Sequence, residues 1–168
     1  MTTLYAQPYD ISAAGFYFTS ADDYAAKAAR AVNDYGDPVE EFEIQFIDGE
    51  DLDCALAGAW GLSQSNVADF LQAAGNWDDR EKIAFIVAVG ECGYRFDSKT
   101  DDPGQLDVDL YEVDSLRQLA EQFADDGLFG EFPKHLSCYI DFEAIARDLA
   151  CDYAMTEIAG TRYAYRCA

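Results

Sequence analysis

The chain has 168 residues, half of them hydrophobic and 14% aromatic, so it can bury the core of one ordinary domain or of a few small ones. Its 33 acidic and 11 basic residues give a formal net charge of −22, which argues against binding to nucleic acid or to acidic membrane surfaces. No apolar run approaches the ~18 residues of a membrane-spanning helix, and "MTTLYAQPYD" has no features of a secretory signal.

The segment 1–60 is expected to form a small α+β domain. Residues 3–18 combine aromatic and aliphatic positions with turn formers, which predicts a strand and a turn-rich connection. Ser20 is a typical N-cap residue, and the acids Asp22 and Asp23 that follow it indicate the first turn of a helix. Apolar residues at helical spacing continue this helix up to Gly36, which is expected to end it.

A second strand is expected where Phe42, Ile44 and Phe46 alternate with polar residues, with its carboxylates on the solvent face. The surrounding segment, residues 37–53, carries eight carboxylates and no base. Like charges so close together oppose compaction and favour only solubility or a partner of opposite charge. This segment is therefore the first candidate for a binding surface.

The segment 61–103 is expected to form a mainly helical middle domain. Apolar residues within 67–74 lie at the spacing of an amphipathic helix, and Asp78 with Glu81 resembles the capping box that begins another. The stretch "FDSKTDDPG" consists of turn formers and is a plausible joint to the next domain.

The segment 104–168 is expected to form a second α+β domain. Its first strand places Leu106, Val108 and Leu110 inward, with Asp107 and Asp109 outward. Asp114 or Ser115 is expected to cap a helix that ends at Gly127, and Asp141 is expected to cap the next helix. A final hairpin is expected to turn at Ala159–Gly160. Three small domains in a row (α+β, mainly helical, α+β) predict an elongated α+β molecule.

The acidic residues are distributed unevenly along the chain. Between Arg30 and Arg80 lie 49 residues without a Lys, Arg or His, and twelve of them are Asp or Glu. Because soluble proteins usually intersperse bases among acids, this block lacks its normal pairing partners. B-DNA carries about one charge per 1.7 Å, so a dimer of this chain would match on the order of 75 Å of duplex. The charge density favours a protein that occupies a DNA-binding groove in place of DNA.

Other interpretations of the charge are a solvated acidic face, salt adaptation and weak cation binding. Salt adaptation predicts acids over the whole chain rather than a base-free block. The stretch "DGEDLD" resembles a calcium loop, but its glycine is second and no Glu closes an EF-hand frame. The stretch "DSKTDD" could hold a cation weakly.

The sequence predicts no catalytic, metal or cofactor site. His135 is the only histidine, and no nucleophile elbow, P-loop or dinucleotide fingerprint occurs. The five cysteines are widely spaced without a CxxC pair, which favours buried thiols in a cytoplasmic protein over a zinc or redox site. We therefore expect a protein that is not an enzyme and uses no cofactor.

Four stretches, "LYAQPYDISAAGFYF", "EEFEIQFIDGED", "VAVGECGYRFD" and "YIDFEAIARDLACDY", resemble the ArdA-type antirestriction proteins. The most specific part is "YIDFEAIARDL", which begins at Tyr139. The resemblance implies an elongated, three-domain α+β protein that dimerises through its C-terminal domain. It implies surface carboxylates that imitate the phosphates of bent DNA and block type I restriction–modification enzymes. It also implies a gene on a mobile genetic element and action in the cytoplasm.

The antirestriction motif of that family would fall on "LFGEFPKHLSCYID", residues 128–141. The family places this stretch at the dimer contact. Lys134 and His135 add positive charge to it, so packing or dimerisation is the expected role rather than phosphate mimicry. The dimer-interface residues implied by the resemblance are Leu128, Phe129, Phe132, Leu136 and Tyr139.

The sequence thus predicts a homodimeric DNA mimic that occupies the DNA-binding groove of a type I restriction–modification enzyme by charge complementarity and counterion release. The main alternative is an acidic binding module for another basic nucleic-acid-binding protein, and a salt-adapted or cation-binding structural protein is the third. The predicted phosphate-mimic acids are Asp22, Asp23, Asp34, Asp37, Glu40, Glu41, Glu43, Asp48, Glu50, Asp51, Asp53, Asp107 and Asp109.

Overall fold

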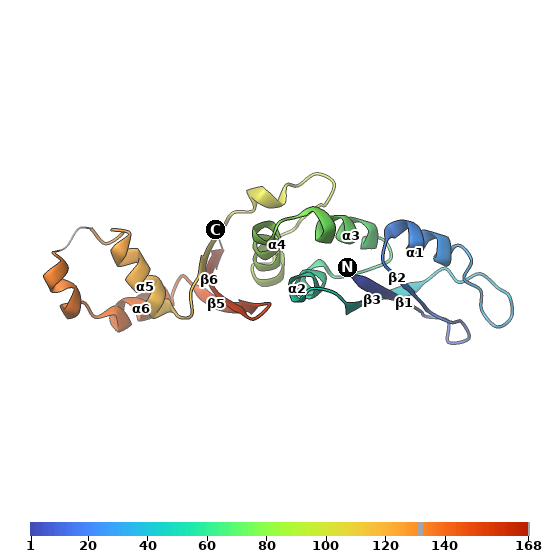
Figure 1. Cartoon of the computed structure of the whole chain (residues 1–168), viewed down its shortest axis with the longest axis horizontal. Helices are drawn as coiled ribbons and strands as arrows, with labels where there is room; N and C mark the ends of the chain where they lie inside the picture. The colour runs from blue at the N-terminus through green and yellow to red at the C-terminus, as the bar shows by residue number, and fades with distance from the viewer. Residues whose placement is uncertain (131–132, 168) are drawn as a thin grey trace. The chain divides into compact units, whose positions relative to one another are not determined.

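The structure is a computed structural model that describes residues 1–130 and 133–167, without the side chains of residues 134, 137 and 138. Helices are mixed with small antiparallel sheets, which confirms the predicted α+β class (Figure 1). The chain divides into two compact units, unit 1 (Met1–Leu106) and unit 2 (Asp107–Ala168). The finer division at residues 60 and 103 stays a prediction. Over the described residues, no helix has the length and apolarity needed to cross a membrane.

Unit 1 contains an antiparallel sheet of strands β1 (Thr3–Pro8), β2 (Phe16–Phe18) and β3 (Phe42–Asp48) in the order β2-β1-β3. Alternation along the strands buries one face, where Leu4, Ala6 and Ile44 have almost no exposed surface. Glu43, opposite Gln7 in the register, lies on the other face and is exposed. The predicted strands and the solvent-facing position of Glu43 are confirmed.

An aromatic cluster covers the buried face of this sheet. Helix α1 (Ala21–Ala28) places the Tyr24 ring against Phe16, Phe18 and Phe42 at centroid separations of 4.9–6.4 Å. The side chain of Ser20 accepts a hydrogen bond from the backbone N–H of Asp23, as its predicted capping role requires. Burial raises the pKa of the Tyr24 phenol above its ordinary value.

The expectation that the first helix continues to Gly36 is wrong, because α1 ends at Ala28. The Asn33 side-chain oxygen accepts hydrogen bonds from the backbone N–H groups of Tyr35 and Asp37, at 3.0 and 2.9 Å. This Asn turn competes with helical hydrogen bonding and folds the chain into a loop. The apolar residues that extended the predicted helix do not face the core, since Tyr35 is 84% exposed.

The Asp10 carboxylate links this loop to the β1–β2 connection. It accepts hydrogen bonds from the backbone N–H and hydroxyl of Ser12 and from the Asn33 amide. The Ser12 hydroxyl contributes most to a lowered pKa of Asp10, followed by the Asn33 amide and the Ser12 N–H. A carboxyl whose folded pKa is lowered adds stability above its unfolded value, 3.8, and loses it as the pH falls through the folded pKa.

We therefore expect Asp10→Asn to lower the stability of the protein at neutral pH, and the difference from wild type to narrow below pH 3.8. Urea unfolding of both proteins across acidic and neutral pH measures this. Asp34→Asn removes an exposed carboxylate on the α1–β3 loop and is the control, with little effect at any pH. A pH-independent difference for Asp10→Asn would contradict the assignment.

The remainder of unit 1 is mainly helical, with α2 (Asp51–Trp60), α3 (Val67–Asn76) and α4 (Asp79–Phe85). The π-helical η1 (Ile86–Glu91) continues α4, and a short 3-10 turn, η2 (Pro103–Gln105), follows later in the chain. The Asp78–Glu81 capping box is confirmed by reciprocal hydrogen bonds of 2.8 and 2.9 Å. Trp60 packs on Phe85 with ring centroids 4.8 Å apart, so these helices share an aromatic core. Helix α2 was not predicted, and its first turn belongs to the acidic segment 37–53.

Unit 2 contains β4 (Val108–Glu112), β5 (Ala154–Ile158) and β6 (Thr161–Cys167) in the antiparallel order β4-β6-β5, with α5 (Leu116–Asp125), η3 (Lys134–Tyr139) and α6 (Phe142–Leu149). Its core is formed by Val113, Leu119, Phe123, Tyr153 and Ala164. Ser115 and Asp141 cap α5 and α6 as predicted. The predicted hairpin turn is also confirmed by φ values of 49° and 81° at Ala159 and Gly160.

Gly15 is a position where a side chain has no room. A Cβ there would lie 2.6 Å from the Ala6 carbonyl oxygen and would also overlap the Tyr5 ring. Because the backbone of β1 cannot yield as a flexible side chain would, we expect Gly15→Ala to destabilise the protein by about 1–3 kcal/mol. Gly58→Ala, in α2 with open space around it, is the control and should stabilise by up to about 1 kcal/mol. Urea unfolding measures both, and equal stabilities would contradict the packing described for Gly15.

Candidate partner-binding surface

Eight exposed carboxylates lie along the path from the loop after α1, through β3, to the start of α2. Asp37 lies in the loop, Glu43 projects from the open face of β3, Asp48 ends that strand, and Glu50 and Asp51 begin α2. We call this set the acidic row; its members are Asp34, Asp37, Glu40, Glu41, Glu43, Asp48, Glu50 and Asp51.

No member of the acidic row forms an ion pair within the described part of the chain. The described ion pairs of unit 1 involve Lys27 with Asp23 and Lys82 with Asp53, each at 2.7 Å, and neither cation reaches the row. The only base in the sequence close to the row is Arg30. The surface therefore presents negative charge that the fold leaves uncompensated, which favours association with a cationic partner.

Helix N-termini position part of this charge. Glu50 is the N-cap residue of α2 and Asp51 lies in its first turn, while Asp22 and Asp23 lie in the first turn of α1. The partial positive charge of a helix N-terminus stabilises such acids by about 0.3–1 kcal/mol each. The fold thus stabilises Glu50 and Asp51, neither of which forms an ion pair within the described residues. Of the two acids in α1, Asp22 is exposed, whereas Asp23 pairs with Lys27.

Asp53 does not belong to the surface, so its inclusion among the predicted partner-binding acids is wrong. Its side chain is 8% exposed and accepts a hydrogen bond of 2.7 Å from Lys82 and another of 2.9 Å from the Thr2 hydroxyl. The helical spacing of Asp53 with the buried residues Leu56 and Ala57 explains its burial. That spacing was a signal in the sequence, but it could be used only once α2 was recognised.

The predicted acids of unit 2 differ from the acidic row. Asp107 is exposed. Asp109 is partly buried and accepts a hydrogen bond of 2.8 Å from the Arg166 guanidinium, which also lies 5.3 Å from the centroid of the Tyr153 ring. The charge of Asp109 is therefore compensated within its own sheet. Nine of the predicted acids, Asp22 and the eight of the acidic row, are exposed, form no ion pair within the described residues and belong to unit 1.

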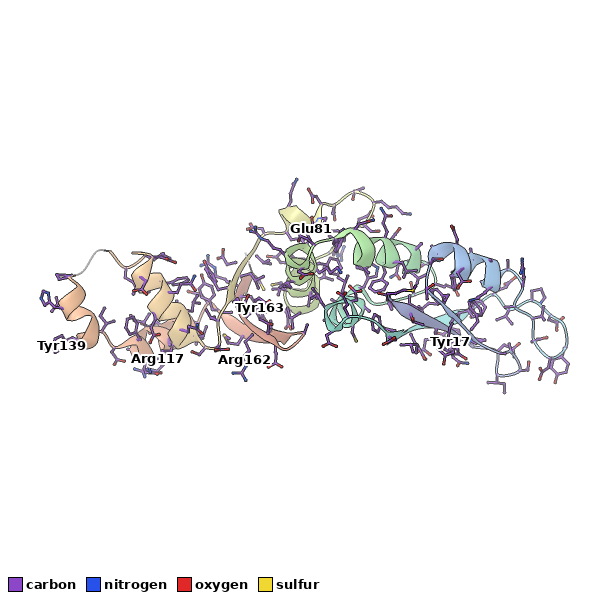
Figure 2. All side chains as sticks on the ribbon, in the orientation of Figure 1. Tyr17, Glu81, Arg117, Tyr139, Arg162 and Tyr163 are labelled. Carbon is purple, nitrogen blue, oxygen red and sulfur yellow. The ribbon has the colours of Figure 1, made fainter. Side chains whose placement is uncertain are left out.

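Unit 2 carries an apolar groove of about 440 Å³, lined by Ala124, Phe129, Leu136, Tyr139, Ile140 and Ile145. Three of these, Phe129, Leu136 and Tyr139, are predicted dimer-interface residues, and Tyr139 is 81% exposed. Leu128, another predicted dimer-interface residue, is adjacent to Phe129 in the sequence and is 61% exposed. The remaining predicted residue, Phe132, lies outside the described residues. Figure 2 shows Tyr139 at the end of unit 2 that is distant from its sheet.

Two predictions about reactive groups can be compared with the structure. The expectation of buried thiols is wrong for Cys54 and Cys151, which are exposed and free. Within the described residues, no group of three or more His, Cys, Asp or Glu side chains is placed to hold a metal ion. A cavity of about 620 Å³ lies beside Asp53 and Lys82. The Lys82 ammonium donates a hydrogen bond to the Asp53 carboxylate, so the charge of each is compensated by the other.

Comparison with known proteins gives the context for this surface. The model of the family described as antirestriction protein (ArdA) matches residues 39–163, well over half of the chain. The match begins within the acidic row and extends through unit 2 as far as Tyr163. No curated protein matches the chain. The chain therefore belongs to the ArdA family of antirestriction proteins.

Proposed function

We propose that this antirestriction protein acts as a DNA mimic, occupying the DNA-binding groove of a type I restriction–modification enzyme and excluding the duplex. The observation that carries the proposal is the acidic row, eight exposed carboxylates that form no ion pair within the described residues. A groove that binds DNA is lined by Lys and Arg, and the row would satisfy those cations as phosphates do.

The driving force of this association is electrostatic. Both the enzyme groove and a protein of net charge −22 hold counterions in solution, and contact between them releases these ions. Because the contributions are spread over many carboxylates, we expect no single one to be essential. The sequence predicts an elongated protein of three small domains that acts in the cytoplasm. Such a shape would present the carboxylates over a length comparable to that of a bound DNA duplex.

We also propose that two copies associate through the apolar groove of unit 2. Its lining residues, together with Leu128, expose the kind of contiguous apolar surface that is common at protein interfaces. A dimer would double the displayed charge and give the mimic two acidic arms. Equilibrium sedimentation of wild type and of Tyr139→Ser tests this, with a shift towards monomer expected for the variant.

The function itself is tested by phage plating in a host that carries a type I restriction enzyme, with and without this protein. We expect the protein to raise the plating efficiency of unmodified phage and to change nothing in a host that lacks the enzyme. Unaltered restriction in the presence of soluble, folded protein would contradict the proposal.

An acidic module for another basic nucleic-acid-binding protein would use the same carboxylates. Capture from a lysate by immobilised protein, with and without excess duplex DNA, separates the two functions. Recovery of a type I enzyme in competition with DNA supports the first, and recovery of a different basic protein in its place supports the second.

A further inference from the structure

Four large apolar side chains are exposed at one end of the sheet in unit 1. They belong to two loops, residues 9–15 between β1 and β2 and residues 29–41 between α1 and β3, which extend beyond the sheet at the same end (Figure 1). We call these four side chains the apolar tip; they are Tyr9, Ile11, Val32 and Tyr35, with exposed fractions of 66%, 102%, 55% and 84%.

The two loops form one structure. Ala13 and Asn33 form an isolated antiparallel bridge, and the backbone N–H of Asp34 donates to the Ser12 carbonyl oxygen at 2.9 Å. The Asp10 carboxylate joins them a second time through its hydrogen bond of 3.0 Å with the Asn33 amide. The apolar tip is therefore presented on a connected pair of loops rather than on two independent segments.

Polar side chains connect the two loops, whereas the large apolar side chains of the tip make no core. Asp10 and Asn33, both half-buried, form the hydrogen bonds that fix both turns. The larger apolar side chains, by contrast, contact solvent. Single exposed apolar residues are common on proteins, but several on one linked pair of loops are typical of an interaction surface.

The charge around the tip selects the kind of partner. Asp34, Asp37, Glu40 and Glu41 lie on the second loop and are exposed, and Arg30 is its only base. A second copy of this chain would bring the same carboxylates together, so self-association through the tip is disfavoured. A partner that satisfies both properties has an apolar recess bordered by Lys or Arg.

We propose that the apolar tip inserts into such a recess in the enzyme that this protein inhibits, and that it supplies a part of the affinity that does not depend on salt. The inference rests on the proposed function and adds a contact of a different physical kind. Counterion release weakens as the salt concentration rises, whereas burial of apolar surface does not. The tip lies outside residues 39–163, the part of the chain that the family model matches. The family match therefore says nothing about the role of the tip.

The test measures displacement of a labelled duplex from a purified type I methyltransferase by the full chain at about 50 and about 200 mM salt. We expect Ile11→Ser with Tyr35→Ser to weaken inhibition about tenfold, by the same factor at both salt concentrations. A second pair, Tyr9→Ser with Val32→Ser, should act in the same direction. Since all four side chains are exposed, the variants should retain the thermal stability of wild type.

The control is Met155→Ser, which removes an apolar side chain, 37% exposed, from β5 of unit 2, outside both the tip and the acidic row. It should inhibit as wild type does. If the tip variants inhibited as well as wild type, the inference would be wrong while the proposed function stands. The same holds if the tip and control variants lost inhibition equally. A change in oligomeric state of the tip variants would also overturn it, by showing that a second copy covers the tip. Wild type that displaces no duplex would instead overturn the proposed function, and the tip's role with it.

Discussion

Simultaneous neutralisation of four members of the acidic row is expected to weaken inhibition on the order of 10- to 100-fold at low ionic strength. The variant carries Asp37→Asn, Glu40→Gln, Glu41→Gln and Glu43→Gln, which keep the shape of each side chain and remove its charge. Each exposed carboxylate contributes about 0.2–1 kcal/mol to a charge pair, so the loss accumulates over the set. The loss should shrink as salt is added, because fewer counterions are released. Inhibition constants from duplex displacement measure it.

Two controls make this prediction specific. Glu43→Gln alone should change inhibition by no more than about fivefold, since no single exposed charge dominates. A variant with the same change in net charge on unit 2 should inhibit nearly as wild type does; its substitutions are Asp125→Asn, Asp126→Asn, Asp148→Asn and Asp152→Asn. If Glu43→Gln alone abolished inhibition, the account of distributed charge would be wrong. If the unit 2 variant were as weak as the first, net charge rather than the acidic row would be responsible.

Lys82→Met is expected to lower the free energy of unfolding by about 3–5 kcal/mol, the largest stability effect that we predict. The Lys82 and Asp53 side chains are 6% and 8% exposed and their charged groups are 2.7 Å apart. Removal of the cation leaves a buried carboxylate whose remaining described partner is the Thr2 hydroxyl. The same pair anchors α2, the helix that presents Glu50 and Asp51, so its loss should also weaken inhibition. Urea unfolding measures the first effect.

Lys27→Met is the matched control for this prediction. Lys27 forms an ion pair of the same length with Asp23, but the two side chains are 44% and 36% exposed. An exposed pair at this spacing on a helix contributes only about 0.3–0.5 kcal/mol. The double variant Lys82→Met with Asp53→Leu should recover most of the lost stability, because no unpaired charge remains buried. A similar cost for Lys82→Met and Lys27→Met would contradict the structural role of the buried pair.

Local chemistry was sufficient to predict the elements of the fold that depend on neighbouring residues. The capping residues Ser20, Ser115 and Asp141 act on backbone groups three positions away, and the alternation along β3 follows from the geometry of one strand. The turn at Ala159–Gly160 is similarly local. The exposure of Glu43 follows from the same alternation, and the other members of the acidic row could be predicted as exposed because carboxylates are almost never buried without a partner.

The errors come from contacts between residues far apart in the sequence. The charge of the buried Asp53 is compensated by Lys82, which lies 29 positions away, and no local pattern connects the two residues. The first helix ends early because Asn33 forms hydrogen bonds with Asp10, 23 positions earlier, and with backbone groups of its own loop. Helical spacing alone predicted that Val32 and Tyr35 would face the core, yet both are exposed. The apolar tip was missed for this reason.

The central claim is that this protein and duplex DNA compete for one cationic groove. The most direct measurement is the equilibrium binding of the purified protein to a type I methyltransferase, titrated with duplex at several salt concentrations. We expect duplex and protein to exclude each other and the affinity for the protein to fall steeply as salt is added. A ternary complex in which duplex remains bound, or an affinity indifferent to salt, would contradict that claim.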